Sequence, residues 1–151
     1  MATLNPRDVV IVDGVRSAMG RTKNGMFRHV RADTLSAELV RALVKRNDFD
    51  TNEVEDLIWG CVMQREEQGM NLGRIVVLGA QLPFTIPGQT VNRLCGSSMS
   101  ALHTASANIM AGLGDVYLVG GVAHMGHLPM MDAHHQDTNN LQAQLPRPYQ
   151  K

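Results

Sequence analysis

The stretch from Thr90 to Val122, TVNRLCGSSMSALHTASANIMAGLGDVYLVGGV, contains the strand, helix and strand that decide the fold. Thr90–Leu94 and Val116–Val122 are rich in β-branched and apolar residues, which is typical of buried strands. Between them, apolar residues recur close to a 3.6-residue period, at Met99, Leu102, Ile109 and Met110. Two glycines, Gly112 and Gly114, end this run. This order predicts two parallel strands joined by a crossover helix.

The same alternation extends toward the N-terminus. The expected segments are a strand at Val9–Val15, a loop at Gly20–Val30, a helix capped at Asp33 or Thr34 that reaches Lys45, a strand at Val54–Val62 and a helix at Asn71–Ala80. Leu35, Leu39 and Leu43 give the first helix one apolar face. The order β-α-β-α-β-α-β predicts an α/β layered fold with a largely parallel sheet.

The composition of the chain changes once, at Met131/Asp132. Residues 132–151 contain no glycine, four glutamines and no helical or strand period. We therefore predict two regions, a folded domain over residues 1–131 and a polar, disordered tail over residues 132–151.

Overall composition excludes several classes of protein. The 151 residues are 44% hydrophobic and 19% charged, which is an ordinary globular balance. The 14 basic residues cancel the 14 acidic ones, so no charge excess points to nucleic acid or anionic lipid. No apolar run approaches the ~20 residues of a membrane helix, and the N-terminus has no secretory signal pattern. With two cysteines that indicate reduced thiols, we expect a cytoplasmic protein.

The residue with the most chemical content is Cys95. It lies where the strand candidate ends at Leu94 and the helix candidate begins, so unpaired amides and the helix dipole favour its thiolate. The small residues Gly96, Ser97 and Ser98 would let a substrate carbonyl approach those amides, which would stabilise an oxyanion. The spacing predicts an acyl-accepting nucleophile, and a buried inert cysteine is the alternative.

Four motifs carry a resemblance to the thiolase family. VNRLCGSSMSALHTA (91–105) resembles the family's nucleophile segment, and its NRLCGSSM form resembles the bacterial 3-ketoacyl-CoA branch. VVIVDGVRSAMGRTKNGMFRHVRADTLSAEL (9–39) is similar to the first strand, loop and helix. LIWGCVMQREEQGMNLGR (57–74) and DVYLVGGVAHMGHLPM (115–130) are similar to the second strand with its turn and to the fourth strand with its loop.

The resemblance implies a definite reaction. Thiolases use CoA to cleave a 3-ketoacyl-CoA into acetyl-CoA and an acyl-CoA two carbons shorter, and the position of Cys95 is that of the acyl-thioester nucleophile. CoA and acyl-CoA are substrates, and no metal or redox cofactor is implied. The degradative bacterial form serves fatty-acid β-oxidation beside a multifunctional hydratase/dehydrogenase subunit, and the family forms dimers. The implied partners are therefore CoA thioesters, a second copy and that subunit, without nucleic acid or membrane.

The sequence also departs from the family pattern. The family's His in a GHP motif, its Cys in a CxG motif, its Asn/His oxyanion pair and its CoA-holding loop domain have no counterpart here. Ala123 stands where the family usually has Glu, and Gly73 where it usually has Ala. We therefore expect a truncated N-terminal half-domain that is inactive alone. Biosynthetic acetoacetyl-CoA thiolase, or a non-catalytic fragment that keeps an interaction surface, are the alternatives.

The remaining candidates have simpler interpretations. The histidines, among them the pair at His124 and His127, lack the companion motifs of a zinc site, so we expect loop histidines. Cys61 is expected in the core. Asn92 and Arg93 are expected to hold the turn before the nucleophile. For Met125, an acyl pocket and ordinary core packing are equally supported.

Overall fold

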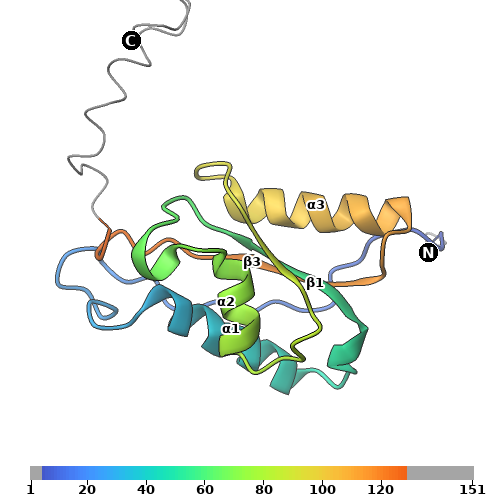
Figure 1. Cartoon of the computed structure of the whole chain (residues 1–151), viewed down its shortest axis with the longest axis horizontal. Coiled ribbons are helices and arrows are strands. Elements are labelled where there is room, and N and C mark those ends of the chain that lie inside the picture. The colour runs from blue at the N-terminus through green and yellow to red at the C-terminus, as the bar shows by residue number, and fades with distance from the viewer. Residues whose placement is uncertain (1–4, 129–151) are drawn as a thin grey trace, which may run out of the picture.

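A three-stranded parallel sheet forms the centre of the molecule (Figure 1). The computed structural model describes residues 5–128. Its elements in chain order are α1 Ala32–Arg46, the short 3-10 turns η1 Thr51–Glu53 and η2 Glu66–Gln68 on either side of β1 Val54–Gly60, then α2 Leu72–Gly79, β2 Gly88–Val91, α3 Ser97–Ala111 and β3 Val116–Gly121. The strands lie in the order β2-β1-β3. The predicted α/β layered fold with a parallel sheet is confirmed.

The register aligns the carboxyl ends of all three strands at one edge of the sheet. Trp59 lies opposite Thr90 of β2 and Gly120 of β3, and Gly60 lies opposite Val91 and Gly121. The turn that follows β2 therefore leaves the sheet beside the ends of β1 and β3.

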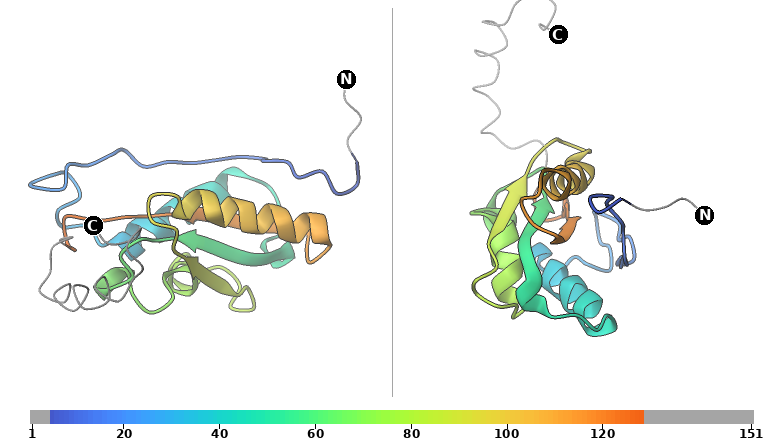
Figure 2. Two further views of the ribbon diagram at one scale, coloured as in Figure 1. Left: turned by 90° about the horizontal axis from the view of Figure 1, so that it is seen from above. Right: turned by 90° about the vertical axis from the view of Figure 1, so that its right-hand side faces the viewer.

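Helices cover both faces of the sheet (Figure 2). On one face, apolar residues of α1 and α2 pack against Leu57 and Trp59 of β1 and Leu118 of β3. On the other face, Ala101 and Ala105 of α3 pack against Ile58. Because successive strand residues point to opposite faces, the second half of β1, residues 57–60, is buried on both and carries no charge, whereas Glu55 and Asp56 interrupt its first half.

The N-terminus of α3 makes the closest approach to the sheet. A Cβ atom on Gly60 would lie 2.4 Å from the backbone nitrogen of Ser98, and one on Gly121 would lie 2.1 Å from the Ser98 Oγ atom. Neither distance is possible for a real side chain. Glycine at both strand ends is therefore what lets α3 begin directly on the sheet.

The predicted strand at Val9–Val15 is wrong. This segment is extended but pairs with no strand, and it runs alongside the sheet (Figure 2). β1 pairs directly with β3, and the segment is tied to the domain mainly by side chains. Ile11 and Val12 are 73% and 85% exposed, so the apolar run is not buried as a strand would be.

The side-chain ties lie at the two ends of that segment. Arg7 pairs with Asp115 at 2.8 Å. Asp13 accepts hydrogen bonds from the Arg46 guanidinium and from the side-chain Nδ2 atom of Asn47. Arg46 and Asn47 hold the pKa of the Asp13 carboxyl well below its usual range. Without a strand at residues 9–15, the observed order of helices and strands is α-β-α-β-α-β.

Other boundaries differ from the sequence expectation by a few residues. β1 ends at Gly60 instead of Val62, and β2 occupies Gly88–Val91 instead of Thr90–Leu94. Neither Asp33 nor Thr34 caps α1, because the helix already begins at Ala32. Its first amide, that of Ala32, instead donates to the Glu67 carboxylate at 2.8 Å. A carboxylate 35 residues away in the sequence thus replaces a local N-cap side chain.

The other helix ends follow local rules. Asn71 caps α2 through its side chain, and Gly112 ends α3 with a φ of 76° in the left-handed region. No helix within residues 5–128 is long and apolar enough to cross a membrane. The predicted tail at residues 132–151 lies outside the described residues.

Replacing Gly60 by Ala should destabilise the domain by about 2–3 kcal/mol, because the new methyl group meets the backbone of α3. Urea unfolding followed by circular dichroism measures the change. Gly14→Ala is the matched control, since a Cβ there meets nothing within 4 Å, and its effect should stay within about 0.5 kcal/mol. Equal unfolding midpoints for the two variants would show that the close approach of α3 is unimportant.

Candidate active site

Cys95 lies in the turn that joins β2 to α3. The strand ends at Val91, Gly96 is the N-cap residue of α3, and the helix begins at Ser97 (Figure 1). Cys95 is exposed and its thiol is free. The thiol is therefore neither in mid-strand nor remote from a helix start, which is the placement that the sequence predicted.

Asn92 holds the first part of this turn. Its Nδ2 atom donates to the carbonyl of Val62 at 2.9 Å, and its Oδ1 atom accepts from the amide of Leu94 at 3.0 Å. The turn is tight enough that Leu94 has a φ of 49°, in the left-handed region that non-glycine residues rarely adopt. Asn92 thus holds the backbone of the turn before Cys95, as the sequence indicated.

The amides near Cys95 are not all available to a substrate. The Gly96 amide donates to the carbonyl of Arg93, and the Ser97 amide donates to the carbonyl of Leu94, each at 3.0 Å. The turn therefore uses these two amides, and they are not available to an oxyanion. Within residues 5–128 the amides of Ser98 and Met99, in the first turn of α3, donate to no partner.

Comparison with known proteins identifies the family to which this turn belongs. Residues 9–146 match the family described as "Thiolase, N-terminal domain". The chain belongs to the thiolase family. It is 73% identical over 131 residues to a protein named 3-ketoacyl-CoA thiolase from Psychrobacter sp. (strain PRwf-1), and 74% identical over 131 residues to one of the same name from Acinetobacter baumannii (strain AYE).

The matches cover unequal shares of the proteins compared. Each alignment covers 87% of this chain but 34% of the relative, so the chain spans about a third of the length of these curated thiolases. The crystal structure of the Bacillus anthracis acetyl-CoA acetyltransferase matches with a TM-score of 0.65 and 31% identity, over 74% of this chain and 28% of that one.

The second cysteine of this thiolase-family chain is a core residue. Cys61 follows β1 and is 1% exposed, and burial raises the pKa of its thiol. Its Sγ atom contacts the carbonyl of Met63 at 3.7 Å. Cys61 therefore packs in the core as predicted, and the two thiols differ sharply in access.

His124 and His127, in the loop after β3, connect this loop to two others through their ring nitrogens. Their rings stack with centroids 3.8 Å apart. His124 Nε2 lies 2.9 Å from the Phe27 carbonyl, and His127 lies between the Glu67 carboxylate at 2.9 Å and the Arg28 carbonyl at 2.8 Å. Residues 5–128 contain no group of three His, Cys, Asp or Glu side chains placed to hold a metal.

Two polar residues of this network, one buried and one partly buried, gave no signal in the sequence. Gln68 is fully buried, and its Oε1 atom accepts from the His124 amide at 2.6 Å. Glu67 accepts from both Ala32 and His127. Both lie in the short 3-10 turn η2, which is too brief for a periodicity to mark a residue as buried, so only the tertiary structure places them.

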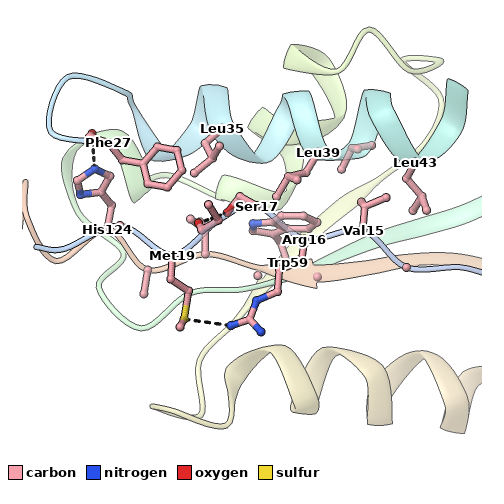
Figure 3. Close-up of a pocket in the computed structure, with 18 of the residues that line it drawn as sticks. Val15, Arg16, Ser17, Met19, Phe27, Leu35, Leu39, Leu43, Trp59 and His124 are labelled. Carbon is pink, nitrogen blue, oxygen red and sulfur yellow. Dashed lines mark hydrogen bonds between the residues drawn. The ribbon is translucent and has the colours of Figure 1, made fainter. Parts of the chain in front are cut away.

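One cavity in the described part of the chain lies on the α1 side of the sheet. It has a volume of about 470 Å³ and lies between residues 13–22, α1 and the end of β3 (Figure 3). Leu35, Leu39 and Leu43 of α1 and Trp59 of β1 line it. Met125 also lines this cavity, and Cys95 does not.

The His127 contacts predict that stability falls as pH rises. Both ring nitrogens of His127 face acceptors, the Arg28 carbonyl and the Glu67 carboxylate, and these raise the pKa of His127 above its ordinary value of 6.5. The positive charge of Arg31 acts in the opposite direction on this pKa. The His124 ring stacks on the His127 ring. A raised pKa gives stabilisation that is complete below the unfolded value and is lost as pH rises through the folded value. Urea unfolding midpoints measured between about pH 5 and 8 should therefore decline with pH.

A histidine variant tests the source of that decline. His127→Gln should flatten the pH dependence, whereas His103→Gln, at an exposed position on α3, should leave it unchanged. If the His127→Gln chain keeps the full decline, another group is responsible.

Proposed function

We propose that this chain supplies the nucleophile of a 3-ketoacyl-CoA thiolase, and that Cys95 is the residue that carries the acyl group. The observation that carries the proposal is the position of Cys95, an exposed free thiol in the β2–α3 turn directly before the helix. Identity of 73–74% to proteins named 3-ketoacyl-CoA thiolase supports the substrate class, compared with 31% to an acetyl-CoA acetyltransferase. This difference favours the degradative reaction over the biosynthetic alternative.

In the proposed reaction, the Cys95 thiolate attacks the 3-keto carbon of the substrate. The bond between C2 and C3 breaks, acetyl-CoA leaves with the electron pair and takes up a proton, and the shortened acyl group stays on sulfur as a thioester. The thiol of CoA then attacks that thioester, which releases acyl-CoA and frees Cys95. In this proposal, charge that develops during the reaction is stabilised by the positive end of the α3 dipole and by the first-turn amides of Ser98 and Met99, which have no partner within residues 5–128.

The setting of the reaction belongs to the same proposal. We propose fatty-acid β-oxidation in the cytoplasm as its context, with CoA thioesters as substrates and with a second copy and a multifunctional hydratase/dehydrogenase subunit as protein partners. We also propose that residues 132–151 form a separate polar tail. The family match continues to residue 146, past this proposed boundary, and the curated relatives align with 131 residues of the chain.

The residues of this chain by themselves should not turn over substrate. Removing a single oxyanion donor typically costs ~10²–10³ in rate, and here the general base also has no counterpart. We expect no detectable CoA-dependent loss of 3-ketoacyl-CoA with the purified chain. Cleavage that Cys95→Ser abolishes would show that residues 1–151 suffice for catalysis.

Selective labelling tests the nucleophile independently of turnover. A haloacetyl-CoA should alkylate Cys95 at least about tenfold faster than Cys61, because the first thiol is exposed at a helix start and the second is buried. Peptide mass spectrometry of the intact, folded chain measures both rates. Cys95→Ser should remove the fast phase and leave Cys61 unlabelled.

The opposite pattern would support the non-catalytic alternative. Equal labelling of Cys95 and Cys61, or a Cys95 rate no greater than that of a free cysteine, would indicate a fragment that keeps only an interaction surface.

A further inference from the structure

Ser97 is a buried polar residue at the start of α3. It is 3% exposed, although its neighbours Gly96 and Ser98 are exposed. Its Oγ atom donates to the carbonyl of Leu94 at 2.6 Å and accepts from the amide of Arg93 at 2.9 Å. One hydroxyl thus makes a donated and an accepted hydrogen bond, both to backbone.

The two backbone partners of this hydroxyl are the residues immediately before Cys95. The bonds therefore span the nucleophile, from Ser97 on the helix side to Arg93 and Leu94 on the strand side. Leu94 has its φ at 49°, a strained conformation that persists only where surrounding groups hold it. The Leu94 carbonyl also accepts from the Ser97 amide at 3.0 Å, so this carbonyl is held twice from the helix.

We propose that Ser97 is a positioning residue for Cys95, whose hydroxyl closes the turn and holds the thiol at the N-terminus of α3. This inference rests on the proposed nucleophilic function of Cys95. The hydroxyl does not touch the reacting atoms in this arrangement. It acts by fixing the backbone on the strand side of Cys95 to the first residue of the helix.

The structure explains why only a hydroxyl suits this position. Alanine would leave the Arg93 amide without its acceptor and would release one of the two bonds to the Leu94 carbonyl. Asn92 restrains the amide of Leu94 but not its carbonyl, so it does not replace the lost bonds. The turn would then open on the side that faces the helix, and Cys95 would move away from the first-turn amides.

The test follows the alkylation of both cysteines in the intact 151-residue chain. Ser97→Ala removes the hydroxyl, Ser97→Thr retains it, and Ser106→Ala makes the same chemical change elsewhere on α3, at a side chain outside the turn. Iodoacetamide rates at Cys95 and Cys61 are measured across the neutral and mildly alkaline pH range by peptide mass spectrometry. Labelling of the buried Cys61 reports unfolding, which separates a loss of position from a loss of fold.

We expect Ser97→Ala to slow Cys95 alkylation at neutral pH by about tenfold. Cys61 should remain protected, Ser97→Thr should recover most of the rate, and Ser106→Ala should match the unmodified chain.

Three results would overturn the proposal. One is an unchanged Cys95 rate and pH profile in Ser97→Ala with Cys61 still protected. Another is a parallel rise of Cys95 and Cys61 labelling, which would assign Ser97 a purely structural role. The third is a Ser97→Thr chain that is as slow as Ser97→Ala while Cys61 stays protected. The failure of the proposed function itself looks different, because Cys95 of the unmodified chain would then react no faster than a free cysteine.

Discussion

The seating of helix α3 on the ends of β1 and β3 is the constraint on which the site depends. Gly60 and Gly121 lie opposite one another in the sheet, and their lack of side chains leaves room for the Ser98 backbone beside Gly60 and for the Ser98 Oγ atom beside Gly121. Once α3 is fixed there, the turn from β2 has only the residues between Val91 and Ser97 in which to reverse. The strained φ of Leu94 and the exposed position of Cys95 both follow from that short connection.

A second set of hydrogen bonds holds together the loops around Phe27, Glu67 and His124. Glu67 and Gln68 are reached by α1, through the Ala32 amide, and by the loop after β3, through His124 and His127. The histidines in turn contact the carbonyls of Phe27 and Arg28. Polar groups from four separate parts of the chain thus satisfy one another, so these loops are ordered by long-range hydrogen bonds instead of by local turns.

The elements that the sequence predicted well are those with local causes. The apolar period of α1, the glycine at 112 that ends α3 and the apolar second half of β1 all act within a few residues. The failures have distant causes. The apolar run at 9–15 satisfies the local pattern of a strand, but β1 and β3 pair with each other and leave it no ladder. The α1 start depends on Glu67, which lies 35 residues away.

The sequence alone determined that a thiol follows a strand and precedes a helix, because small residues, apolar periods and glycines encode those boundaries locally. It also carried the resemblance to thiolases, which the family match over residues 9–146 established. Only the tertiary structure decided which amides around Cys95 are used by the turn, and that the Ser97 hydroxyl closes it. The physical reason is that a hydrogen-bond partner is selected by three-dimensional proximity, which a one-dimensional pattern of residue types does not specify.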